Sequence, residues 1–186
     1  MTDTKKLKAY VTTIGEQTTN LCVEQLMKYG FEVIVLDKTE PWIDKYKRFI
    51  KMADGDCLRI DADTLVNENA MLIGVDVKPE EYIIAHIYYD MYKNNISLGG
   101  PVFYTKKGLD IIRENLDKIS EQRPETSAVR LKQFIGHMGR RDFVMGIHGL
   151  GQDDITIERA IYNKVMRRQL DTYNFEFIKK INKLYE

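Results

Sequence analysis

The sequence predicts an α/β fold, a three-layer α/β/α sandwich with a mostly parallel central sheet. Three observations lead to this prediction. Apolar, β-rich runs alternate with stretches of helical periodicity, the connections between them are short, and no repeat or low-complexity tract interrupts the chain. A chain of 186 residues is long enough to bury a sizeable core as one domain. We therefore expect residues 1–186 to form a single domain, with residues 1–75 and 76–186 as its two halves.

The first half of the chain alternates strand and helix. Residues 7–14, 31–36 and 57–60 are short apolar runs rich in β-formers. Between them, apolar residues recur at helical spacing in residues 21–29 and 42–53. A βαβαβ order with short connections predicts parallel strands, and ligands of such sheets bind beyond the carboxyl ends of the strands.

The second half is less regular. Residues 82–89 have the pattern of a buried strand, and Leu98-Gly99-Gly100-Pro101 that of a turn before a short strand. Another strand is expected at residues 143–147. Helical periodicity is found in four further segments: residues 105–119, 131–138, 153–170 and 173–186.

The composition is that of an ordinary globular protein and excludes several classes. The formal net charge is zero, which argues against a globally basic nucleic-acid binder. Cys22 and Cys57 are too few for a disulfide framework. The N-terminus lacks the apolar run of a signal peptide, and the longest apolar stretch, residues 82–89, is too short for a membrane span. We therefore expect no membrane span and a cytoplasmic location.

Polar side chains follow each of the three strands predicted in the first half. Thr12 and Thr13 end the first strand, Asp37 the second, and Asp61 and Asp63 the third. Two carboxylates spaced in this way can approach one ion where the chain turns, and Mg²⁺ and Mn²⁺ prefer oxygen ligands. The alternative for an isolated Asp-x-Asp is a turn whose Asp caps the next element. The position after the third strand favours the ion site.

The segment ADGDCLRIDADTLVN, residues 53–67, resembles the Asp-x-Asp region of GT-A glycosyltransferases, especially those of the family 2 type. The resemblance implies the fold of nucleotide-diphospho-sugar transferases, with residues 1–75 as the nucleotide-binding half and residues 76–186 as the acceptor-side half. It implies Mn²⁺ or Mg²⁺ at Asp63, and Asp61 as a donor contact close enough to share the ion. The remaining donor contacts implied at the strand ends are Asp37 at the base, and Thr12 and Thr13 along the nucleoside pocket.

Two later segments support the resemblance. LGGPVFYTKKGLD, residues 98–110, resembles the Gly-Gly strand and helix that line the acceptor side. GLGQDDITIERA, residues 149–160, resembles the segment that supplies the catalytic base, which would be Asp153 or Asp154. Simple helix capping is the alternative for this acidic pair. The resemblance also makes His148 a candidate further metal ligand, with a hydrogen-bonding or surface group as its alternative. Lys45 is a candidate diphosphate contact, with a solvated helix face as its alternative.

The function expected from these features is metal-assisted, inverting transfer of a sugar from a nucleotide donor, with UDP and GDP as candidate carriers. The acceptor is not identified, and the sequence leaves open whether the chain forms a homo-oligomer. Two other functions stay open. The segment DADTLV also matches the nucleophile motif of haloacid-dehalogenase-type phosphatases, in which Asp61 would be the nucleophile. The third reading is a non-catalytic nucleotide-sugar-binding module.

Overall fold

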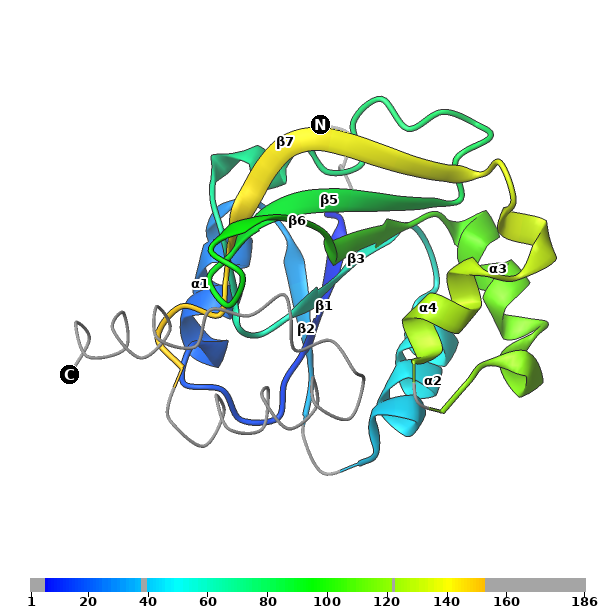
Figure 1. Cartoon of the computed structure of the whole chain (residues 1–186), viewed down its shortest axis with the longest axis horizontal. Coiled ribbons are helices and arrows are strands. Elements are labelled where there is room, and N and C mark those ends of the chain that lie inside the picture. Colours follow the sequence, from blue (N-terminus) through cyan, green and yellow to red (C-terminus); the bar gives the residue numbers. More distant parts are fainter. Residues whose placement is uncertain (1–5, 38–39, 122, 153–186) are drawn as a thin grey trace.

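The structure, a computed structural model, describes residues 6–37, 40–121 and 123–152. The helices expected in residues 153–186 lie outside the described residues. The described part is a mixed α/β fold built on a curled seven-stranded sheet with the strand order β2-β1-β3-β6-β5-β7-β4 (Figure 1).

The βαβαβ order predicted for the first half is confirmed. Its elements are β1 (Lys8–Thr12), α1 (Thr19–Lys28), β2 (Glu32–Leu36), α2 (Trp42–Met52) and β3 (Cys57–Asp61). Strand β1 lies between β2 and β3 and is parallel to both. Thr12 is in register with Leu36 on one side and Asp61 on the other, so the three strands end at the same level.

The second half departs from a mostly parallel sheet. It contains β4 (Thr64–Val66), β5 (Ile83–Asp90), β6 (Asn95–Tyr104), α3 (Lys106–Arg113), α4 (Pro124–Val129) and β7 (Met138–His148), with 3₁₀ turns at Glu68–Leu72, Leu116–Lys118 and Lys132–Phe134. Strands β5 and β7 are parallel, whereas β3/β6, β5/β6 and β4/β7 are antiparallel. The prediction of a mostly parallel sheet is therefore corrected to a mixed sheet. The reason is the short connection between β5 and β6, because neighbouring parallel strands need a long crossover.

Two local predictions are also corrected. The segment expected to turn at Leu98-Gly99-Gly100-Pro101 is part of the continuous strand β6. A Cβ on Gly100 would lie 2.7 Å from the ring of Tyr88, so this glycine permits close packing within the sheet. The helix expected at residues 131–138 is only a 3₁₀ turn, Lys132–Phe134, followed by Gly136 at φ +80° and then β7.

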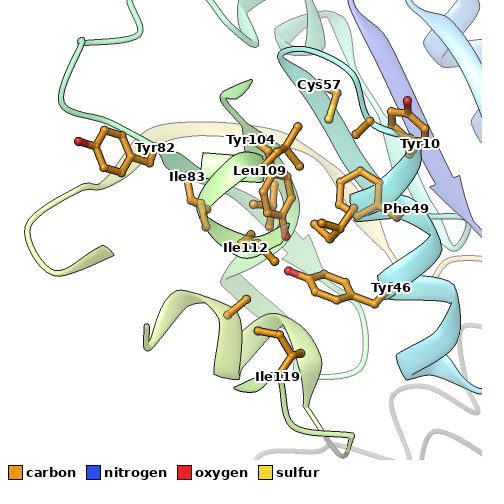
Figure 2. Close-up of a cluster of buried hydrophobic side chains, with 14 of the residues drawn as sticks. Tyr10, Tyr46, Phe49, Cys57, Tyr82, Ile83, Tyr104, Leu109, Ile112 and Ile119 are labelled. Carbon is orange, nitrogen blue, oxygen red and sulfur yellow. The ribbon is translucent and has the colours of Figure 1, made fainter. Parts of the chain in front are cut away.

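Apolar side chains pack on both faces of the sheet. On one face, Tyr10 of β1, Phe49 of α2 and Tyr104 of β6 pack edge to face, with ring centroids 5.1 and 5.3 Å apart (Figure 2). Helices α2, α3 and α4 gather over this face (Figure 1). The neighbours of Tyr10 in β1 point the other way and pack with Cys22 and Leu26 of α1. The ends of β1 and β3 are thus fixed between two cores.

In the part of the chain that the structure describes, no helix combines the length and the apolar character needed to cross a membrane.

Candidate functional site

The Asp61 carboxylate is held at the end of β3 by two donors. The Thr12 hydroxyl, in register on β1, donates to Asp61 Oδ1 at 2.7 Å. The guanidinium of Arg59 donates to the same oxygen. The Arg59 side chain is 3% exposed, whereas that of Asp61 is 38% exposed. The carboxylate is therefore held through Oδ1 by Thr12 and Arg59, and the rest of it is open to solvent.

Arg59 belongs to a cluster that joins β3 to α2 and α4, which we call the Arg59 cluster (Trp42, Arg59, Asp61 and Glu125). The guanidinium lies 4.7 Å from the centre of the Trp42 ring, and 3.7 Å separates it from Glu125 Oε1. The Trp42 indole N–H donates to Glu125 Oε2 at 3.1 Å. Burial opposes the charged form of Arg59, but Asp61 and Glu125 outweigh it and raise the pKa of Arg59 above its ordinary value. Arg59 is thus a permanent cation.

Asp63 takes part in a second cluster, which we call the His148 cluster (Asp63, Asp90 and His148). His148 Nε2 lies 3.2 Å from Asp63 Oδ2, and His148 Nδ1 lies 3.5 Å from Asp90 Oδ1. The second oxygen of Asp63, Oδ1, is buried and has no hydrogen-bond partner among the described residues. A buried carboxylate oxygen without a donor is costly, so this atom is suited to accept a ligand that carries positive charge.

The curled end of the sheet builds the His148 cluster. The last residue of β7, His148, is in register with Asp90 on β5 and with Thr64 on β4. Gly149 N donates to Asp63 O at 2.8 Å, which ties the Asp-x-Asp turn to the end of β7. Three strands from both halves of the chain therefore meet at one imidazole.

Two carboxylates flank the His148 imidazole and set its charge. Burial acts to lower the pKa of His148, but Asp63 and Asp90 outweigh this and raise it to about 10. The site is therefore built to stabilise a cation between Asp63 and Asp90, which is the imidazolium itself when nothing else is bound. Sequence reasoning missed Asp90, although it ends an apolar strand, as Asp37 and Asp61 do.

No protein-family model matches the chain, and no curated protein matches it. Solved structures of several transferases are similar in fold, and two of them align as follows. A glycosyltransferase involved in the glycosylation of the major capsid of PBCV-1 aligns over 86% of this chain and 99% of its own, with a TM-score of 0.55 and 15% identity. The 4-diphosphocytidyl-2C-methyl-D-erythritol synthase from Anaerococcus prevotii DSM 20548 aligns over 97% and 98%, with a TM-score of 0.51 and 10% identity.

This chain has the GT-A-like fold of nucleotide-diphospho-sugar transferases. The fold resemblance inferred from the Asp-x-Asp segment is therefore confirmed. At these identities the likeness concerns the fold alone.

The described residues offer a metal ion some of the ligands that it needs, but not all of them. Among residues 6–37, 40–121 and 123–152, no three His, Cys, Asp or Glu side chains converge on one position suited to an ion. Asp61, Asp63 and His148 therefore do not form a complete ligand group by themselves. The unpartnered Oδ1 of Asp63 beside His148 nevertheless fits a divalent cation whose remaining ligands come from substrate phosphates and water.

The structure places the other predicted site residues in different surroundings. Lys45 is 1% exposed, and its ammonium donates to the Thr13 carbonyl at 2.6 Å, so it supports the chain just after β1. Burial lowers the pKa of Lys45. Asp37 is 71% exposed at the end of β2, where Arg48 lies 3.3 Å away. Asp153 and Asp154 lie outside the described residues.

A hydrogen-bond chain that the sequence did not suggest joins Gln152 to the Asp-x-Asp turn. Gln152 is buried and donates to the Thr18 hydroxyl at 3.2 Å. The Thr18 hydroxyl donates to the Ala62 carbonyl at 2.9 Å. Gln152 is thereby linked, through Thr18 at the N-terminal end of α1, to the middle of the Asp-x-Asp turn.

Proposed function

We propose that the protein is a nucleotide-sugar-dependent glycosyltransferase that binds Mn²⁺ or Mg²⁺ at Asp63. The observation that carries the proposal is the buried, unpartnered Oδ1 of Asp63, next to His148 and two residues from the anchored carboxylate of Asp61. This arrangement lies at the carboxyl ends of β1 and β3, where ligands of such sheets bind. The GT-A-like fold supports the same conclusion.

The two carboxylates have separate roles in this proposal. Asp61, whose Oδ1 is occupied by Thr12 and Arg59, uses its solvent-facing oxygen to accept hydrogen bonds from hydroxyl groups of the donor. Asp63 and neutral His148 would hold the cation, which would supply positive charge for the donor diphosphate. Thr12, Thr13 and Asp37 line the nucleoside side, with a UDP- or GDP-linked sugar as the donor.

The chemical step is inverting displacement at the anomeric carbon. The bound cation would neutralise the charge that develops on the departing nucleoside diphosphate. One acid of the Asp153–Asp154 pair takes the proton of the acceptor hydroxyl as that oxygen attacks. Lys45 contributes indirectly, because its ammonium fixes the Thr13 carbonyl at the nucleoside side of the site.

Nucleotidyl transfer is a second candidate, because the 4-diphosphocytidyl-2C-methyl-D-erythritol synthase from Anaerococcus prevotii, whose name contains a cytidyl group, aligns with nearly the whole chain. The two reactions differ in their products. A glycosyltransferase releases a nucleoside diphosphate from a nucleotide-sugar, whereas a nucleotidyltransferase releases pyrophosphate from a nucleoside triphosphate. A phosphatase with Asp61 as nucleophile is less well supported, because two β–α units precede the Asp-x-Asp segment and Arg59 engages its carboxylate.

The test is nucleotide binding with and without Mn²⁺, measured by calorimetry on the wild type and on Asp63→Asn. We expect the wild type to bind UDP or GDP at least about a hundredfold more tightly with Mn²⁺, because a cation held by Asp63 would offset the negative charge of the diphosphate. In Asp63→Asn this enhancement should disappear. Asp142→Asn is the matched control, because it removes the same charge from a side chain that is 82% exposed.

Nucleotide affinities that are equal with and without Mn²⁺ in the wild type would overturn the metal assignment. Release of phosphate from a generic phosphomonoester by the wild type, abolished in Asp61→Asn, would favour the phosphatase. Mn²⁺-dependent binding without turnover of any nucleotide-sugar in a panel of acceptors would leave the non-catalytic binding module as the better description.

A further inference from the structure

Asp90 is a buried acid that the proposed chemistry does not use directly. Its side chain is 3% exposed at the end of β5. One oxygen, Oδ1, accepts a hydrogen bond from the backbone N–H of Tyr92 at 3.0 Å and faces His148 Nδ1 at 3.5 Å. The other oxygen, Oδ2, lies 3.5 Å from both the Ser97 hydroxyl and the Lys93 ammonium. The carboxylate is therefore fixed by its own turn and by β6.

Aromatic rings restrict the His148 imidazole from other directions. The rings of Tyr88 and Tyr92 meet it edge to face, with centroids 5.3 and 5.4 Å away. The space beside Tyr92 is tight, because a Cβ on Gly149 would lie 2.5 Å from that ring. The imidazole is thus held with Nδ1 toward Asp90 and Nε2 toward Asp63.

We propose that Asp90 is the positioning residue of the cation site. It engages His148 through Nδ1 and so presents Nε2 to the ion that Asp63 binds. This inference rests on the proposed function, because it assumes a divalent cation at Asp63. A carboxylate that accepts a hydrogen bond from the far nitrogen of a metal-binding imidazole fixes the tautomer and ring orientation and makes the ligand more basic.

The charge and position of Asp90 suit the positioning of His148 better than direct binding of the ion. Its carboxylate lies on the far side of the imidazole from Asp63, and its two oxygens already face Tyr92 N, Ser97, Lys93 and His148. With His148 neutral and a divalent ion bound, the negative charge of Asp90 remains close enough to stabilise the site.

The first experiment measures the affinity for Mn²⁺ alone by electron paramagnetic resonance. Asp90→Asn keeps the size of the side chain and an acceptor oxygen but removes the charge. We expect it to bind Mn²⁺ about ten- to a hundredfold more weakly than the wild type, the usual effect of removing such a partner. Asp142→Asn, which removes an exposed charge from β7, should bind as the wild type does.

The second experiment is ¹⁵N NMR of the histidines in metal-free protein, and it does not depend on metal binding. In the wild type, the Nδ1 proton of His148 should exchange slowly with water because Asp90 accepts it. This proton should exchange faster in Asp90→Asn and stay protected in Asp63→Asn. Because the wild-type spectrum alone tests the contact, the inference stays testable even where Asp90→Asn fails to fold.

The outcomes separate this inference from the proposed function. A wild type that binds no Mn²⁺ overturns the ion site, and with it both the proposed metal dependence and the role of Asp90 in presenting a ligand. A wild type that binds Mn²⁺ beside an Asp90→Asn variant of equal affinity overturns only the role of Asp90. A freely exchanging Nδ1 proton in the wild type does the same.

Discussion

The two carboxylates of the Asp-x-Asp segment are balanced by different cations. Asp61 meets Arg59, which lies two residues earlier on the same strand and belongs to the Arg59 cluster with Trp42 and Glu125. Asp63 meets His148, which comes from the last described strand. Both partners are largely buried, yet they differ in chemistry. A guanidinium stays protonated in proteins, whereas an imidazole can release its proton and then bind a metal.

In the proposed function, this difference would allow one short segment to serve two purposes. The charge of Asp61 is neutralised permanently, so that its exposed oxygen acts as a hydrogen-bond acceptor of fixed orientation. The charge of Asp63 is balanced by the imidazole of His148, which in the proposed function would lose its proton when a divalent ion binds. The structure therefore separates a fixed contact from an exchangeable one over a distance of two residues.

The largest effect is expected from breaking the Arg59 cluster. Arg59→Met should lower the free energy of unfolding by about 3–4 kcal/mol, because it leaves Asp61 and Glu125 without their shared cation. The measurement is urea unfolding at neutral pH. Arg140→Met is the control, because Arg140 is 60% exposed and its pair with Asp142 should contribute less than about 1 kcal/mol. Equal losses in the two variants would contradict the structural importance of the Arg59 cluster.

An intermediate effect on the free energy of unfolding is expected from pH. It sharpens the comparison through His86, whose pKa, unlike that of His148, is not shifted by an acidic side chain of the described residues. Burial lowers the pKa of His86 to about 4, with Arg141 acting in the same direction. In the unfolded chain, the imidazole of His86 is protonated with the ordinary histidine pKa of about 6.5. The contribution of neutral His86 to stability is therefore complete above pH 6.5 and is lost as the pH falls toward 4.

His86→Leu tests this sign directly. Between pH 7 and pH 4, the unfolding free energy of the wild type should fall by about 2–3 kcal/mol more than that of the variant. Urea unfolding at a series of pH values gives the two curves. Parallel curves would mean that the pKa of His86 is the same in the folded and the unfolded protein, which would weaken the view that Asp63 and Asp90 are what make His148 different.

The smallest effect is expected from crowding the His148 cluster. Gly149 and Gly30 both have positive φ angles, +82° and +92°, at which an alanine costs about 1 kcal/mol. A Cβ at Gly149 would also lie 2.5 Å from the Tyr92 ring, whereas nothing lies within 4 Å at Gly30. Gly149→Ala should therefore lower the free energy of unfolding by about 1–2 kcal/mol more than Gly30→Ala, as measured by urea unfolding. Similar costs would argue that the Tyr92 ring does not confine His148.

The parts of the site that could be predicted from the sequence are those set by local order. Thr12, Asp37 and Asp61 end strands whose apolar runs are visible in the sequence, and their common level follows from parallel pairing. The proximity of Asp63 and His148 was suggested by the family resemblance, because no local pattern joins residues so far apart in the chain.

Other features depend on pairings that no local pattern reveals. Asp90 meets His148 only because β5 and β7 pair in parallel, and Glu125 meets Arg59 only because α4 packs beside α2. Gly99 and Gly100 indicated a turn, because adjacent glycines are common in turns. In the structure, Gly100 lies in a strand against the Tyr88 ring, a contact that the sequence does not show. Lys45 has the spacing of a surface residue, but its ammonium is buried at the Thr13 carbonyl.

The pairing of β4 with β7 also bears on the order in which the protein folds. The contact between Asp61 and Arg59 lies within one strand, and β1 and β3 are joined by a modest length of chain. The contact between Asp63 and His148 requires the closure of a much longer loop, and contacts of that kind form slowly. Chains that have assembled only the first three strands already hold the fixed carboxylate in place. Asp63 acquires His148 as its partner only when the sheet is complete, so a partly folded chain would lack the proposed cation site.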